Sequence, residues 1–134
     1  MKFRSLVLIG LGLVSLITMH AMPIGHNDIP KQIEISDIPP NMTEIDIMGC
    51  LDFGSNPNSV EAYYNQNMVV VCFHQNFGYV HMILIGEMGN TVYNNTVNTA
   101  IQQTFYIPIA GVPDGRYTLI LDSVNGHAEG DFEK

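Results

Sequence analysis

The chain is predicted to be an all-β protein, a single domain of two stacked sheets at residues 32–134. After residue 31 no long stretch shows helical periodicity. Instead, short runs rich in Val, Ile, Tyr, Phe and Thr are separated by Gly, Asn, Asp and Pro. Several of these runs are apolar on both faces of a strand, which favours two packed sheets over one open sheet. The predicted fold is therefore a two-sheet β-sandwich of about seven to nine strands.

Residues 1–21 are interpreted as a signal peptide that precedes this domain. A basic start is followed by the uncharged apolar run Ser5–Thr18 and then by the small residue Ala21. The run is shorter than the ~20 apolar residues of a spanning helix, so no membrane span is expected after cleavage. An uncleaved anchor stays open as an alternative, because Met19 is a poor residue three places from the cut. Residues 22–31 are expected to form an exposed leader.

The expected strands follow one another along the domain, each bounded by turn residues. Residues 65–67 and 125–126 carry hairpin signals, and Gly89 supplies a turn position that tolerates positive φ. The predicted strands are Gln32–Ser36, Glu44–Leu51, Val60–Tyr64, Met68–His74, Tyr79–Gly86, Thr91–Val97, Thr104–Ile109, Arg116–Ser123 and Ala128–Glu133.

Two of these strands, Met68–His74 and Tyr79–Gly86, are expected to pair as a hairpin. Alternation then gives this hairpin one core face and one outer face, and the outer face is also apolar. Such a face is either covered by isoleucines of residues 33–47, which is the favoured alternative, or offered to a partner. The candidate partner surface consists of Val70, Cys72, Ile83 and Ile85.

The same register would place Cys72, His74 and His81 together on that outer face. A thiolate and two imidazoles suit zinc or copper, but a fourth ligand is missing and a one-residue slip would scatter the set. No metal or other cofactor is therefore expected. Cys50 and Cys72 are an even pair in an exported chain, so a disulfide and two free thiols both stay open.

Charge and motif content argue against several functions. The chain has 13 acidic and 5 basic residues and a net charge of −8, which disfavours nucleic acid and anionic membranes as partners. No Gly-x-Ser-x-Gly motif or arguable Ser-His-Asp set is present, so the protein is not expected to be an enzyme.

Several short motifs occur in a recognisable order from Met68 onward. They include Val92-Tyr93, the run Gly115–Leu119 that reads Gly-x-Tyr-x-Leu, and a final Gly130–Phe132 that reads Gly-x-Phe. In this order the chain resembles small secreted bacterial proteins of the family called domain of unknown function 3244. The resemblance implies an immunoglobulin-like or fibronectin-like sandwich on an exported protein, and it brings no known activity. The chain departs at Gly86, where the family usually has an acidic residue.

Tyr117 is expected to have a structural role at the start of the penultimate strand. The turn Pro113-Asp114-Gly115 leads the chain directly into this residue. Sandwiches of this kind carry a tyrosine corner here, with the hydroxyl bonded back to nearby backbone. The sequence therefore predicts structural roles for Tyr117, Gly115 and Gly89.

The leading functional hypothesis is an exported, non-catalytic binding or adhesion-type module for an unknown protein or glycan. The expected location is the periplasm, the cell surface or the medium. An alternative is a structural or assembly component of the cell envelope that acts through an edge strand. A small hydrolase or a metal-binding protein is the third reading.

Overall fold

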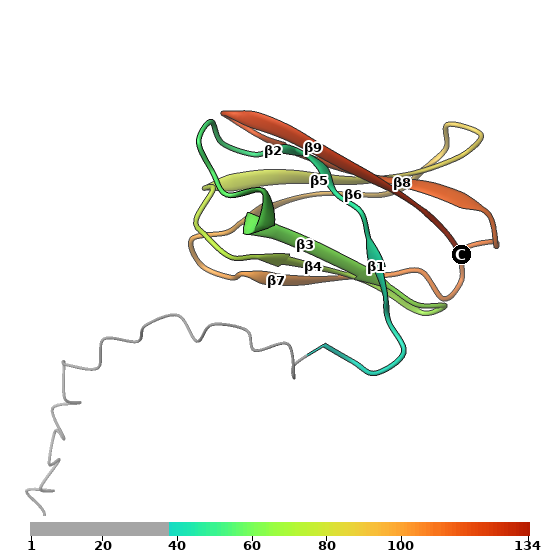
Figure 1. The fold of residues 1–134 in the computed structure, drawn as a ribbon. Coiled ribbons are helices and arrows are strands. Elements are labelled where there is room, and N and C mark those ends of the chain that lie inside the picture. The colour runs from blue at the N-terminus through green and yellow to red at the C-terminus, as the bar shows by residue number, and fades with distance from the viewer. Residues whose placement is uncertain (1–37) are drawn as a thin grey trace, which may run out of the picture. The chain divides into compact units, whose positions relative to one another are not determined.

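The computed structural model describes residues 38–134, and these residues form nine strands and one short 3-10 helix (Figure 1). The expected signal peptide, leader and first strand at Gln32–Ser36 lie outside the described residues. Within the described part, no helix is long and apolar enough to cross a membrane. The elements are β1 (Thr43–Ile45), β2 (Met48–Cys50), η3 (Pro57–Ser59), β3 (Val60–Tyr64), β4 (Met68–Phe73), β5 (Tyr79–Gly86), β6 (Thr91–Asn98), β7 (Thr104–Pro108), β8 (Arg116–Ser123) and β9 (Gly126–Glu133).

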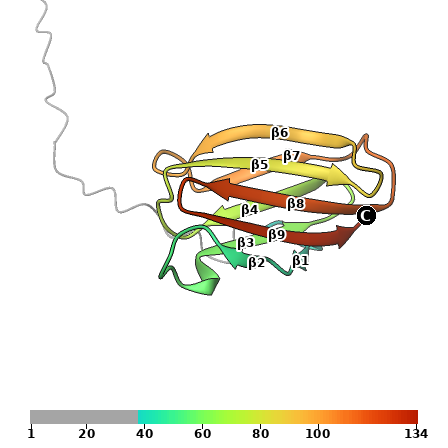
Figure 2. The ribbon, with the colours of Figure 1, turned by 90° about the horizontal axis from the view of Figure 1, so that it is seen from above.

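The strands build two antiparallel sheets that stack face to face (Figures 1 and 2). The four-stranded sheet A has the order β1-β3-β4-β7, and the five-stranded sheet B has the order β2-β9-β8-β5-β6. The connections β1–β2, β2–β3, β4–β5, β6–β7 and β7–β8 pass between the sheets, while β3–β4, β5–β6 and β8–β9 stay within one sheet. The predicted two-sheet β-sandwich is confirmed.

Alternate residues of the long strands fill the space between the sheets. Each strand of this kind presents every second side chain inward, as the period of two requires. Burial of each large apolar side chain contributes about 1.5–3 kcal/mol. The fully buried side chains of this core include Val69, Val71, Phe73, Val80, Met82, Leu84, Ile107, Leu119 and Leu121.

The expected hairpin of β4 and β5 is wrong, because the two strands belong to different sheets. β4 pairs with β3 and β7, and β5 pairs with β6 and β8. Residues 74–78 carry the chain from one layer to the other. Both strands bury their apolar face in the same core, one from each side. The alternation pattern alone therefore did not distinguish a β4–β5 hairpin from two strands in facing sheets.

The segment expected as one strand, Glu44–Leu51, is divided into two short strands in different sheets. β1 pairs with β3 at the edge of sheet A, and β2 pairs with β9 at the edge of sheet B. The crossing lies against Gly130 of β9, where a Cβ atom would stand 2.7 Å from the Asp46 carbonyl oxygen and 2.8 Å from Ile47 Cδ1. The absence of a side chain at Gly130 therefore lets this segment close one side of the sandwich.

We predict that Gly130→Ala destabilises the domain by about 1–3 kcal/mol, because the added methyl overlaps backbone that has little room to move. Gly111→Ala is the matched control, since no atom lies within 4 Å of its Cβ position. Urea unfolding of both variants measures the difference. Equal stability of the two variants would contradict the close packing at Gly130.

Candidate functional site

The four residues expected to form one partner surface lie on two opposite outer faces. Val70 and Cys72 belong to sheet A, whereas Ile83 and Ile85 belong to sheet B. Val70 lies between Tyr63 and Tyr106 in the sheet register, and both Val70 and Cys72 are only 1% exposed. The premise of a single shared face was therefore wrong, because it depended on the β4–β5 hairpin.

The histidines and cysteine considered for a metal site are separated in the same way. His74 Nε2 lies 2.9 Å from Glu61 Oε2 beside sheet A, and His81 Nε2 donates to Asn94 Oδ1 on sheet B. Burial raises the pKa of the Cys72 thiol, which disfavours the thiolate that binds metals. No three His, Cys, Asp or Glu side chains among residues 38–134 are grouped to hold an ion.

The two cysteines are free thiols in sheets that lie on opposite sides of the core. Cys50 is exposed at the end of β2 in sheet B, and Cys72 is buried in β4 of sheet A. A disulfide would have to join the two layers. Of the two alternatives left open by the sequence, the structure therefore has the free thiols.

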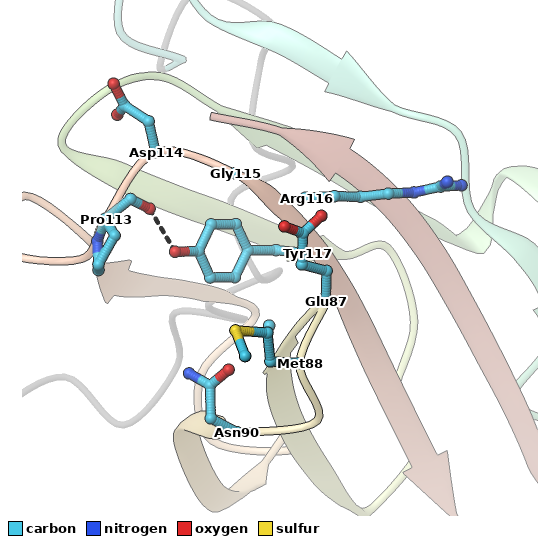
Figure 3. Close-up of a pocket in the computed structure, with 9 residues that line it drawn as sticks. Glu87, Met88, Asn90, Pro113, Asp114, Gly115, Arg116 and Tyr117 are labelled. Carbon is cyan, nitrogen blue, oxygen red and sulfur yellow. Dashed lines mark hydrogen bonds between the residues drawn. The ribbon is translucent and has the colours of Figure 1, made fainter.

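A pocket of about 410 Å³ lies between the β5–β6 turn and the loop that precedes β8 (Figure 3). Met88, Pro113 and Tyr117 supply its apolar wall. A volume of this size is in the range of small-molecule sites. The remaining lining residues are Gly86, Glu87, Asn90, Asp114, Gly115 and Arg116.

Tyr117 fixes the geometry of this pocket. Its hydroxyl donates a hydrogen bond to the Pro113 carbonyl oxygen, which is the tyrosine-corner arrangement (Figure 3). Its ring stacks on that of Phe132, with the two centroids 5.7 Å apart. Gly89 and Gly115, in the two bordering segments, have φ of 84° and 156°, values that glycine adopts without strain. The pocket is therefore formed by contacts that stabilise the fold, because they hold its two bordering turns in place.

The lining groups of the pocket do not assemble a catalytic pair. None of its nine residues is a serine, cysteine or histidine. Arg116 Nη2 donates to Asp131 Oδ2 at 2.9 Å, so the guanidinium already has a carboxylate partner. The Thr118 hydroxyl and Arg116 together lower the pKa of Asp131, which keeps this carboxylate ionised. The pocket thus offers an apolar wall and scattered charges without a nucleophile and its base.

The other end of the sandwich presents a different surface, composed of large apolar side chains in the connections and at the start of β5. Figure 1 shows the β2–β3, β4–β5, β6–β7 and β8–β9 connections together at this end. Four side chains there are between 69% and 94% exposed. We call them the end-loop row: Phe53, Val124, Tyr79 and Ile101.

Backbone pairing and hydrogen bonds connect the segments of the end-loop row one after another. The Ser123 hydroxyl, next to Val124, donates to the Leu51 carbonyl oxygen two residues before Phe53. Ser123 also pairs with Val80, the neighbour of Tyr79. Beyond it, the Thr99 amide donates to the Gly78 carbonyl oxygen at 2.9 Å, which brings the turn of Ile101 beside β5.

The sequence interpretation missed this row because it treated the connections as plain loops. A signal was present, since Phe53, Ile101 and Val124 are large apolar residues at turn positions that normally carry polar ones. The four connections contain two ionisable side chains, those of Asp52 and His74. The adjoining strand ends add the ion pairs of His127 with Asp122 and Glu129, so this end combines exposed apolar side chains with bordering charged groups.

Two stacked antiparallel sheets that share one core and carry a tyrosine corner define an immunoglobulin-like β-sandwich. The chain belongs to the family described as Domain of unknown function (DUF3244), which matches residues 53–134. The resemblance seen in the sequence is thereby confirmed.

A solved structure supports the same fold. The crystal structure of a DUF3244 family protein with an immunoglobulin-like β-sandwich fold, from Bacteroides vulgatus ATCC 8482, superposes with a TM-score of 0.61. The two sequences are 18% identical over 69% of this chain and 98% of the other. Similarity at this level shows the fold alone. No curated protein matches the chain.

We predict that Tyr117→Phe destabilises the domain by about 0.5–1.5 kcal/mol, because the substitution removes one hydrogen bond and keeps the buried ring. Urea unfolding checks this value. Tyr79→Phe is the matched control, since the Tyr79 side chain is exposed and its loss of a hydroxyl should change stability little. If Tyr117→Phe were as stable as the parent, the bond to Pro113 would have no net effect on folding.

His127 makes the stability of sheet B depend on pH. Hydrogen bonds to Asp122 and then Glu129 raise the pKa of His127 above its ordinary value of 6.5. Because the pKa of His127 is higher in the folded state, the protonated imidazole stabilises the fold fully below pH 6.5. This contribution is lost as the pH rises through the pKa of the folded state. We therefore predict that His127→Gln loses more stability relative to the parent at pH 6 than at pH 9.

Chemical unfolding at the two pH values measures the effect of His127→Gln. In an Asp122→Asn background the difference between pH 6 and pH 9 should shrink, because the main cause of the pKa shift is absent. An equal loss at both pH values in the parent background would refute the coupling.

Proposed function

We propose that this protein is an exported, non-catalytic binding module of the adhesion type, and that it contacts its partner through the end-loop row. The single observation that carries the proposal is the exposure of Phe53, Tyr79, Ile101 and Val124 at one end of the sandwich. Large apolar side chains gathered on a surface commonly indicate an interaction site. Connections held by a rigid sandwich are also the usual place for binding residues.

The chemistry of the row indicates the kind of partner. Covering exposed apolar area contributes about 25 cal/mol per Å², and the row brings two aromatic rings and two aliphatic side chains. None of the four side chains is charged, so an apolar protein surface fits the row better than an ionic one. Phe53 and Tyr79 also offer ring faces that a glycan could stack against, so a glycan is the other partner class of the proposal.

Two further observations support the proposal that the module is non-catalytic and exported. The pocket at Tyr117 has no nucleophile among its lining residues. The first 21 residues have the layout of a signal peptide, which supports the proposal that the module is exported to the periplasm, the cell surface or the medium.

A double variant, Phe53→Ser with Tyr79→Ser, tests the proposal. We expect it to recover the specific partner from an envelope extract at least about tenfold less well than the parent, because aromatic anchors dominate interface energies. Met88→Ser is the matched control, since Met88 is equally exposed but lies at the opposite end of the sandwich. A glycan array probed with the same three proteins covers the second partner class.

The readout is the set of proteins and glycans that the parent and the Met88→Ser variant retain in common. Circular dichroism and urea unfolding confirm that the double variant is folded. Equal retention of every protein and glycan by all three proteins would overturn the assignment of the end-loop row as the binding surface.

A further inference from the structure

The two sheets have four edge strands among residues 38–134, and one of them differs from the rest. Sheet A ends in β1 and β7, and sheet B ends in β2 and β6. β1 and β2 are three residues long, and β7 has five residues and ends at Pro108. β6 has eight residues and runs along one side of the sandwich (Figure 2). An edge of this length presents a row of unpaired backbone groups.

β6 has none of the side chains that usually protect an edge. Its sequence, Thr-Val-Tyr-Asn-Asn-Thr-Val-Asn, contains no charge and no proline, although the chain as a whole carries 13 acidic and 5 basic residues. Natural edges are commonly blocked by lysine, proline or bulges. The one bulge in the β5–β6 pair lies at Leu84/Ile85, so the register is regular from Tyr93 to Asn98.

The free backbone groups of β6 can be assigned from its pairing with β5. The Thr99 amide donates to the Gly78 carbonyl oxygen at 2.9 Å, so this pair is hydrogen-bonded. Hydrogen-bonded and non-hydrogen-bonded pairs alternate along an antiparallel ladder. The register then places three residues in non-hydrogen-bonded pairs, with their amides directed away from β5: Asn94, Thr96 and Asn98. The Asn98 carbonyl oxygen already accepts from two amides of the following turn, so complete free amide–carbonyl sets remain at Asn94 and Thr96.

We propose that β6 is a self-association edge, which pairs antiparallel with β6 of a second copy of this chain. The two amide–carbonyl sets at Asn94 and Thr96 are spaced two residues apart and are complementary to the same strand in the reversed direction, as a two-fold contact requires. A neutral strand is also the place where two molecules of net charge −8 meet with least repulsion. This assembly uses backbone groups of β6, so it goes beyond the proposed binding through the end-loop row and does not depend on it.

Sedimentation velocity of the purified full chain over a wide concentration range tests the proposal. We expect a monomer–dimer equilibrium in the parent. Thr96→Pro should weaken the dimer at least about tenfold, because it removes a paired amide from each copy. The fold should tolerate this change, since proline is accepted where the amide points away from the sheet. Thr96→Lys should weaken the dimer as well, and Ala100→Lys, which adds the same charge in the adjoining turn, should leave it intact.

Hydrogen exchange supplies a second readout. Protection of the amides of Asn94 and Thr96 should rise with protein concentration in the parent. A parent that is monomeric at every concentration, or dimers of Thr96→Lys as stable as those of the parent, would overturn the proposal. Protection that is independent of concentration would also overturn it and would assign the edge to another segment of the same chain. Should Thr96→Pro fail to fold, the comparison of Thr96→Lys with Ala100→Lys decides.

Discussion

Phe73, Leu84 and Leu119 meet in one apolar layer between the two sheets, and every other feature of the domain depends on this layer. It requires strands of both sheets to turn alternate side chains inward, and it therefore sends the connections to the two ends of the sandwich. The segment that crosses at Gly130 closes one side of the layer. The opposite side is bounded by the edge strands β6 and β7. Within residues 38–134 no further strand pairs with β6, the edge proposed for self-association.

The two ends of the sandwich have different chemistry although the same core supports them. At one end Tyr117 links β8 to Pro113, and the neighbouring pocket combines an apolar wall with carboxylates and an engaged arginine. At the other end the connections present exposed apolar side chains such as Phe53 and Val124, beside the ion pairs that His127 makes at the adjoining strand ends. The end at Tyr117 is therefore a stabilised corner of the fold. At the other end, folding does not explain why the apolar side chains are exposed.

Much of the fold could be predicted because period-two alternation and turn residues are local signals. They identified seven of the strand positions from Val60 onward, the inward-facing residues such as Met82, and the corner at Tyr117. The candidate site could not be predicted in the same way. Its members come from three connections and the first residue of β5. Their proximity depends on how the two sheets stack, which no local pattern of Tyr79 or Ile101 specifies.

The sequence by itself determined the fold class, the core faces of the strands, the tyrosine corner and the family. Only the tertiary structure decided which sheet each strand joins. Alternation states which side chains of a strand share a face, but it does not name the neighbouring strand. The connection at residues 74–78 is long enough both to return beside β4, about 4.8 Å away, and to cross to the other sheet, about 10 Å away. The chain crosses to the other sheet because both strands then bury their apolar faces in one core. This crossing separates Cys72 from His81 and brings the residues of the end-loop row to one end of the sandwich.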